Sequence, residues 1–176
     1  SKGRIQTQNQ TMKFVNTQIY LPKIRDVNCR SNAEISFVAD HFVARATSNG
    51  GGDWTIIRPA ANQNSNEIYR KVWRLDNGRT LLLRSGNGNA LVSSPDGTTQ
   101  TAFATSNLTA IAQGKTANEL YFADGADIKR VGYNNLNTAT LVKNLSTTDT
   151  IFDLHVFDNG DFVAVGKNEL FKHYKA

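Results

Sequence analysis

Short apolar runs recur along the chain at intervals of about 40 residues. Phe-Val-Ala stands at residues 42–44 and again at 162–164, and Leu-Leu-Leu at 81–83 and Leu-Tyr-Phe at 120–122 lie between them. The four runs begin at 42, 81, 120 and 162, so the steps are 39, 39 and 42 residues. Runs of this length, flanked by polar residues, predict short β-strands. The regular spacing predicts a repeated unit.

Turn-forming sequences separate the predicted strands. Asp-Asn-Gly occurs at residues 76–78 and again at 158–160, and glycine-rich turns occupy 48–52, 86–89 and 95–97. Such sequences supply the positive φ that tight hairpin turns require. The chain contains 19 Asn, 17 Thr and 13 Gly. These residues favour turns and strands over helices, so the composition agrees with the pattern.

The pattern divides the chain into four units, each predicted as a small antiparallel sheet. The predicted strands are 34–39, 41–47, 53–58 and 67–72 in the first unit; 72–75, 79–84, 90–93 and 99–104 in the second; 108–112, 119–123, 127–133 and 138–142 in the third; and 151–157, 161–165 and 169–174 in the fourth. Four-stranded units that repeat about every 40–45 residues are typical of a β-propeller. We therefore predict a mainly β, propeller-like fold.

The fourth predicted unit has one strand fewer than the others. Residues 12–21 are β-prone and belong to no other unit, so they can supply the missing strand and close the ring. Closure would remove the exposed edge of an open sheet. The alternative is a larger ring, completed by further sequence or by a partner chain. The domain prediction is an N-terminal segment, 1–32, which is a closing strand or an amphipathic helix, and a β-repeat domain, 33–176.

Two local sequences resemble known propeller repeats. Residues 47–54 resemble the Asp-box hairpin of sialidase-like propellers, with Asn49 in place of the aspartate, and residues 94–98 resemble a second copy without the tryptophan. Residues 120–124, followed by Ile128 and Tyr133, resemble the Tyr-Trp-Thr-Asp repeat of receptor propellers. These resemblances imply a propeller and assign the Asp box a structural role as a fold-back.

The N-terminal segment admits a second interpretation. Four of its apolar residues follow a helical spacing of 7, 3 and 4: Ile5, Met12, Val15 and Ile19. Residues 8–15 and 24–29 resemble the exposed half of a type IV minor pilin or pseudopilin helix, and residues 69–82 are similar to a strand pair of the pilin head. This resemblance implies an α+β fold in which helix 4–26 packs on an antiparallel sheet, with the membrane half of the helix before residue 1. Pro22 argues against an unbroken helix.

Charge and cysteine content exclude some functions and some structural features. The chain carries 20 Lys+Arg and 15 Asp+Glu, a net charge of +5, but the basic residues are scattered. We therefore expect no nucleic-acid partner. No apolar run approaches the roughly 18 residues of a membrane helix. The single cysteine, Cys29, excludes an internal disulfide, and the polar composition suits a bacterial or phage protein outside the cytoplasm, on the cell envelope or extracellular.

Sequence patterns of catalysis and metal binding are largely missing. The three histidines lack the spacing of metal ligands: His41, His155 and His173. Nucleophile-elbow and phosphate-loop sequences are also lacking. Paired carboxylates at 124–127 and 158–161 fall in predicted turns. We expect no cofactor and no enzymatic activity, although a glycosidase stays an alternative because of the Asp-box resemblance.

Aromatic side chains are the candidate binding residues. Tryptophan and tyrosine stack on sugar rings and anchor protein partners. The predicted binding residues are Trp54, Trp73, Tyr69, Tyr133 and the loop residue Asn49. The sequence predicts a non-catalytic recognition or assembly module that binds a glycan or a protein on a surface, and it is compatible with a homo- or hetero-oligomer. A minor pilin or pseudopilin of a type IV pilus or type II secretion assembly is the other structural alternative.

Overall fold

The structure is a computed structural model of the chain. It describes residues 4–7, 10–13, 23–31, 34–40, 42–46, 54–57, 68–84, 90–105 and 107–176, and for 4–7, 10–13, 54–57 and 100 the backbone alone. The chain forms two compact units: residues 1–86 with 91–101, and residues 87–90 with 102–176. Each unit is described by itself.

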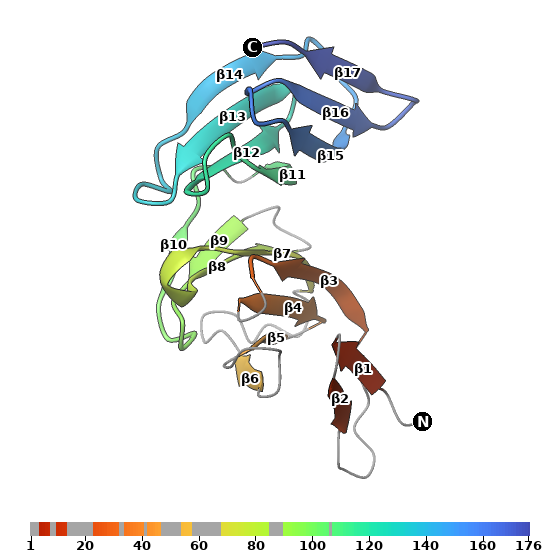
Figure 1. Ribbon diagram of the computed structural model, residues 1–176. Helices are drawn as coiled ribbons and strands as arrows, with labels where there is room; N and C mark the ends of the chain where they lie inside the picture. The colour runs from red at the N-terminus through yellow and green to blue at the C-terminus, as the bar shows by residue number, and fades with distance from the viewer. Residues whose placement is uncertain are drawn as a thin grey trace. The chain divides into compact units, whose positions relative to one another are not determined.

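The first unit contains a hairpin and two four-stranded sheets (Figure 1). The hairpin is β1 (Arg4–Thr7) with β2 (Gln10–Lys13); the first sheet is β3 (Ile24–Cys29), β4 (Ile35–Ala39), β5 (Phe42–Ala46) and β6 (Trp54–Ile57); the second is β7 (Tyr69–Arg74), β8 (Thr80–Arg84), β9 (Ala90–Ser93) and β10 (Gln100–Ala102). A short 3-10 turn, Asp76–Gly78, joins β7 to β8. Each strand follows its sheet neighbour in the sequence.

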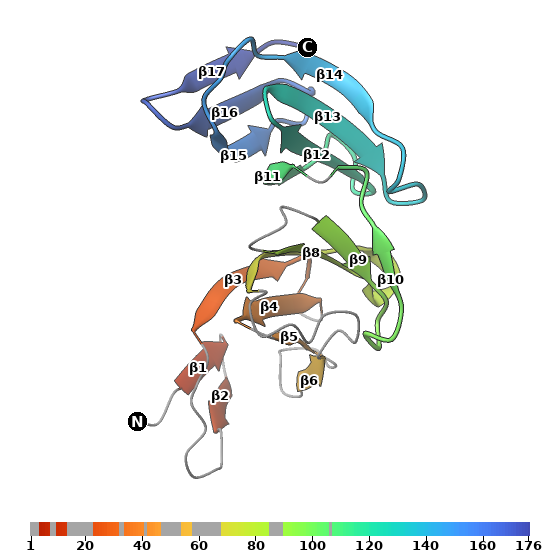
Figure 2. The same ribbon diagram turned by 180° about the vertical axis from the view of Figure 1, so that it is seen from behind.

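The second unit contains two further sheets with the same meander order (Figure 2). The third sheet is β11 (Leu108–Gln113), β12 (Glu119–Asp124), β13 (Asp127–Gly132) and β14 (Thr140–Asn144); the fourth is β15 (Ile151–Val156), β16 (Phe162–Gly166) and β17 (Phe171–Tyr174). The prediction of a mainly β chain in four small antiparallel sheets is therefore confirmed at this coarse level.

The first predicted unit differs from the first observed sheet by one strand. Its first strand is β3, Ile24–Cys29, whereas the prediction began at residue 34. The predicted strand 67–72 instead opens the second sheet as β7. The reason is that strand β3 buries little: Ile24 and Val27 are 48% and 58% exposed. Its side chains therefore give no clear alternation of apolar and polar positions.

The pilin-like alternative is wrong. Within the predicted helix 4–26, the described residues form β1, β2 and the start of β3, and the described chain contains no α-helix. Ile5 and Met12, seven residues apart, are paired positions of the β1–β2 hairpin, so their spacing also fits two strands separated by a turn. No helix of the described residues is long and apolar enough to cross a membrane.

Ring closure by the N-terminal strand stays a prediction. Met12 pairs with Ile5 in a separate hairpin, and most of the predicted closing strand, residues 14–21, lies outside the described residues. The fourth sheet has three strands in the described structure, with β17 at its edge. The Asp-box resemblance at 47–53 also falls outside the described residues.

All four sheets share one irregularity. The first strand of each carries a register shift near its start, at Ile24/Asp26, Tyr69/Lys71, Leu108/Ala110 and Ile151/Asp153. A bulge adds a residue to one strand and increases the local twist. The common position of the bulge shows that the sheets are structural repeats, which the sequence spacing had indicated without showing where each repeat begins.

Within each unit the sheets stack face to face. In the first unit Val38 and Val43 of the first sheet pack on Val72 and Leu82 of the second. In the second unit Leu154, Phe162 and Ala164 of the fourth sheet join the core of the third. The first strands of neighbouring sheets contact each other: β3 with β7, and β11 with β15. This stacking buries apolar side chains between the sheets, which stabilises each unit.

Candidate functional site

The predicted aromatic residues lie in different environments. Tyr69 and Trp73 are both on β7; Tyr69 is 5% exposed and Trp73 is partly buried. Tyr133 belongs to the second unit, where it is 1% exposed and its hydroxyl lies 3.5 Å from Gln113 Oε1. The side chain of Trp54 lies outside the described residues, as does the whole of Asn49.

Burial of an aromatic ring limits its ability to stack on a ligand. A sugar stacks on the open face of an aromatic ring, and a ring with almost no exposed surface offers none. Tyr69 instead packs in the core of the first unit with Val38 and Leu82. A binding role for Tyr69, Tyr133 and the other predicted residues stays a prediction, and the structure favours packing for these two tyrosines.

A row of three exposed side chains, two of them apolar, crosses the fourth sheet, and sequence reasoning did not select it. Asp153 pairs with Val165, and Val165 pairs with Phe171, so the three side chains share one face. Phe171 is 65% exposed and Val165 is 39% exposed. The opposite face of the same sheet is buried against the third sheet through Leu154 and its neighbours. One face of this sheet is therefore packed and the other is open.

The open face continues toward the β15–β16 turn. His155, Val163 and His173 form the next row across the same three strands. Beyond it, Phe157, Asp158, Asn159, Asp161 and His173 line a shallow depression. The rings of His155 and Phe157 meet edge to face at 4.8 Å. A partner on this face would meet apolar rings together with hydrogen-bonding groups.

Hydrogen bonds hold two of the residues that line the depression, Asn159 and Asp161. The backbone N–H of Ala176 donates to Asp161 Oδ1 at 2.8 Å, and the N–H of Asp161 donates to Asn159 Oδ1 at 3.0 Å. The bond from Ala176 is the largest cause that lowers the pKa of Asp161 below its usual value. Asp161 is therefore an ionised carboxylate on this face, and it holds the backbone of Ala176 beside β16.

The paired carboxylates at 124–127 serve the hairpin between β12 and β13. Lys129 Nζ lies 2.6 Å from Asp124 Oδ2 and 3.8 Å from Asp127 Oδ2. Asp127 Oδ1 also accepts a hydrogen bond of 2.7 Å from Asn144. The ammonium group occupies the place where a cation would bind, which supports the turn-forming interpretation of this pair. The described residues contain no cluster of three potential metal-ligating side chains of His, Cys, Asp or Glu.

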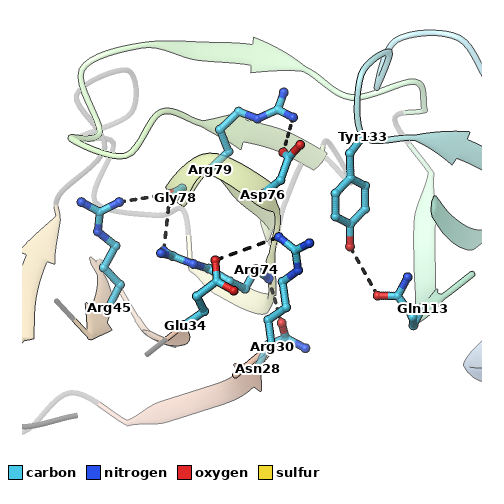
Figure 3. A network of polar contacts seen from close by, with 10 residues as sticks. All are labelled: Asn28, Arg30, Glu34, Arg45, Arg74, Asp76, Gly78, Arg79, Gln113 and Tyr133. Atoms are coloured by element: carbon cyan, nitrogen blue, oxygen red, sulfur yellow. Dashed lines mark hydrogen bonds and ion pairs between the residues drawn. The ribbon is translucent and has the colours of Figure 1, made fainter. Parts of the chain in front are cut away.

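Arginine side chains gather in the first unit around the turn after β7 (Figure 3). Arg45 Nη1 and Arg74 Nη1 both donate to the carbonyl of Gly78, at 3.1 and 3.4 Å. Arg30 lies 4.0 Å from Glu34 at the same place. Arg74 is 6% exposed, so a full positive charge is buried there. The spacing of these residues along the sequence gives no signal of this cluster.

Comparison with known proteins adds information about the fold. No protein-family model and no curated protein matches the sequence. Solved structures do match. YCF48 bound to D1 peptide superposes with a TM-score of 0.58 at 13% identity, over 91% of this chain and 52% of that one. Virginiamycin B lyase from Staphylococcus aureus gives 0.63 at 13% identity, over 94% of this chain and 59% of that one. The fold is β-propeller-like.

The third similar structure leads to the same conclusion. The extracellular domain of the one-component system BT4673 from Bacteroides thetaiotaomicron gives a TM-score of 0.62 at 11% identity, over 98% of this chain and 22% of that one. This chain thus spans between about one fifth and three fifths of the length of these three structures. At such identities the similarity concerns the fold, and propellers of one fold carry unrelated functions.

Proposed function

We propose that this chain is a non-catalytic binding module that takes an extended segment of a protein partner along the edge of β17. The observation that carries the proposal is the open face of the fourth sheet. Phe171 on the edge strand β17 and Val165 on the neighbouring strand β16 are both exposed there. The other three large sheets have four strands each, and this one has three. An added strand would give it the same number.

The chemistry of such a partner follows from the alternation along β17. An edge strand offers unpaired N–H and C=O groups, which an extended peptide satisfies by adding a strand. Phe171 and His173 lie on the open face, and Lys172 lies on the other. The matching segment would carry an apolar side chain that packs on Phe171. That one similar propeller-like structure is described as bound to a peptide supports a peptide partner over a glycan.

The competing occupant is the N-terminal segment of the chain itself. Residues 12–21 were predicted to close the ring on this edge, whereas Met12 pairs with Ile5 in the described structure. A strand from residues 14–21 would compete with an external peptide for β17. The test below separates the two occupants.

The proposal includes the absence of catalysis and a location outside the cytoplasm. Support for the first comes from the described carboxylates, because those of 124–127 are engaged by Lys129 and Asp161 by a backbone N–H. Support for the second comes from the single cysteine and the abundance of Asn and Thr. Incubation with chromogenic glycosides is expected to give no turnover above buffer, and turnover that depends on one carboxylate would favour the glycosidase alternative.

The experiment combines hydrogen exchange with selection of binding peptides. In the free protein, the outward-facing amides of β17 are expected to exchange rapidly. Decapeptides selected on the full chain from a random displayed library are expected to protect these amides. Slow exchange of β17 together with residues 14–21 in the free protein would show that the chain closes on itself, and the proposal would be wrong.

Variants provide the control. Phe171→Asp places a charge in the exposed row and is expected to weaken the selected peptides at least about tenfold, which is 1.4 kcal/mol. Leu141→Asp is the matched control, since Leu141 is 56% exposed on β14 and lies outside the row. Equal loss of affinity in both variants, or no loss in Phe171→Asp, would contradict the proposed site.

A further inference from the structure

The most unusual polar group in the first unit is the guanidinium of Arg74. Arg74 lies at the end of β7, is 6% exposed, and has a hydrogen-bond acceptor for Nη1 in the carbonyl of Gly78. Its Nε is buried and has no hydrogen-bond partner in the described structure. A buried charge with an unused donor is costly, and such groups commonly indicate a ligand, an ion or water.

A second unused polar atom lies in the same region. Asn28, Ser36 and Arg45 pair across β3, β4 and β5, so their side chains form one row on one face. Asn28 accepts a 2.8 Å hydrogen bond from the backbone N–H of Arg74, which places this row against β7. Ser36 is fully buried, and its hydroxyl also lacks a partner in the described part of the chain.

Arg45, the third residue of this row, completes the cluster. Its Nη1 donates to Gly78 at 3.1 Å, so two guanidinium groups converge on one carbonyl (Figure 3). Gly78 has φ +75°, and a Cβ there would lie 3.0 Å from Arg45 Nη1 and 3.2 Å from Pro95. A glycine is therefore required for this approach. Burial lowers the pKa of Arg74, and the charge of Arg45 lowers it further.

The surrounding carboxylates do not cancel this charge. Glu34 lies 4.0 Å from Arg30 and acts on Arg74 only at longer range. Asp96 acts on Arg45 through its charge, and its carboxylate also accepts hydrogen bonds from the hydroxyl groups of Ser94 and Thr98. Four arginines, Arg30, Arg45, Arg74 and Arg79, thus face three carboxylates, Glu34, Asp76 and Asp96, an excess of one positive charge.

We propose that Arg45 and Arg74, with the Ser36 hydroxyl, form a binding site for a carboxylate. The Nε–Nη2 edge of a guanidinium presents two parallel N–H groups that fit both oxygens of a carboxylate. Arg74 uses Nη1 for Gly78, so its unused Nε lies on this other edge. Arg45 is only half-buried and links the cluster to solvent. The site lies in the first unit and does not depend on the proposed function of β17.

The test measures binding of defined anions to the full chain by calorimetry at constant ionic strength. The probes are citrate, inorganic phosphate, a glycine-serine decapeptide with a free C-terminus, and the same peptide with an amidated C-terminus. Saturable binding of citrate would identify a small acid as the source. Binding of the free-acid peptide alone would identify a polypeptide terminus. The proposal would be overturned if neither citrate nor the free-acid peptide binds, or if the amidated peptide binds as well as the free-acid peptide. Binding of phosphate without binding of citrate or the free-acid peptide would also overturn it.

Variants separate binding from a structural role of the arginines. Arg45→Gln and Ser36→Ala are expected to weaken the bound probe, Arg45→Gln by about tenfold or more. Arg130→Gln in the second unit is the matched control, because Arg130 is a half-exposed arginine and pairs loosely with Glu119 at 3.5 Å. Arg74→Lys keeps the positive charge but lacks the parallel N–H groups of a guanidinium, so it is expected to abolish binding of the probe. Unchanged affinity in Arg45→Gln, with the protein folded, would overturn the site.

Discussion

The carboxylate of Asp26 on β3 accepts a 2.9 Å hydrogen bond from the backbone N–H of Val72 on β7. Two residues further along both strands, Asn28 does the same for Arg74 at 2.8 Å. Val72 belongs to the first strand of the second sheet, whose backbone pairs with β8 on one side only. Side chains of the first sheet therefore serve as acceptors for the free edge of the second.

Loss of this acceptor is expected to destabilise the first unit. Asp26→Ala leaves the Val72 N–H without its partner, which costs about 1–3 kcal/mol when the group is buried. Asp26→Asn keeps an acceptor oxygen and is expected to lose less. Urea unfolding of both variants measures the difference. Equal free energies of unfolding for wild type and Asp26→Ala would show that water replaces the carboxylate at no cost.

The Asp96 turn is expected to make thermal stability depend on acid pH. Hydrogen bonds from Ser94 and Thr98 lower the pKa of Asp96 from 3.8 to about 2. Because the folded pKa is the lower one, the unfolded chain takes up the proton first as pH falls. The stabilisation is therefore present above pH 3.8 and is lost as pH falls toward 2.

The measurement is the Tm difference between wild type and Asp96→Ala at several pH values. The difference is expected to be largest near neutral pH and to shrink through this acid range. Ser94→Ala removes the donor with the largest effect on this pKa and is expected to show a smaller version of the same profile. A Tm difference that stays constant across the range would contradict the assignment.

Gly166 at the end of β16 is expected to tolerate no side chain. A Cβ there would overlap the carbonyl oxygen of Thr150, a backbone atom that a hydrogen bond from the Lys167 N–H holds in place. Gly166→Ala should therefore cost about 1–3 kcal/mol through overpacking. Gly132→Ala is the matched control, since its Cβ would lie 2.7 Å from the terminal Oδ1 of the Asn134 side chain, which can move, and 4.0 Å from the carbonyl oxygen of Asn118. Thermal unfolding that ranks the two variants the other way would contradict this.

Burial predicts opposite outcomes for two phenylalanines of the second unit. Phe122 is fully buried and meets Phe103 edge to face at 5.0 Å, whereas Phe171 is 65% exposed. Phe122→Ala is expected to cost about 3–5 kcal/mol, because it leaves a cavity. Phe171→Ala is expected to change the free energy of unfolding by less than about 0.5 kcal/mol. Urea titration of both variants tests the contrast, and a large loss in Phe171→Ala would mean that its face is covered in solution.

Much of the repeat is readable from the sequence because turns and apolar runs agree there. The strand predicted at 119–123 is observed as Glu119–Asp124, and the strand predicted at 90–93 as Ala90–Ser93. Strand β3 escapes the same reasoning because Asp26 and Asn28 provide hydrogen-bond acceptors to β7 in place of apolar side chains. A strand that stabilises its neighbour through polar atoms gives no apolar alternation.

The candidate sites are harder to predict for a related reason. Arg45 and Arg74 meet only because two sheets stack, and no spacing rule links residues on separate sheets. Phe171 is apolar and lies in a strand, but the sequence does not say which sheet face another layer covers. Tyr69 and Tyr133 were predicted as binding residues because they are aromatic, but side-chain type alone does not show burial, and the structure places both in the cores of their units.

The meander order has a consequence for synthesis of the protein. Every strand in the described sheets pairs only with its neighbours in the sequence, so each sheet needs no residue made later. Contacts between residues close in sequence form quickly, and domains fold while the chain leaves the ribosome. Each sheet can therefore form as soon as its last strand emerges, and within each unit the first sheet to form can serve as a template for the second. The last layer to emerge, β15–β17, has no successor among the described strands, and that is where Phe171 meets water.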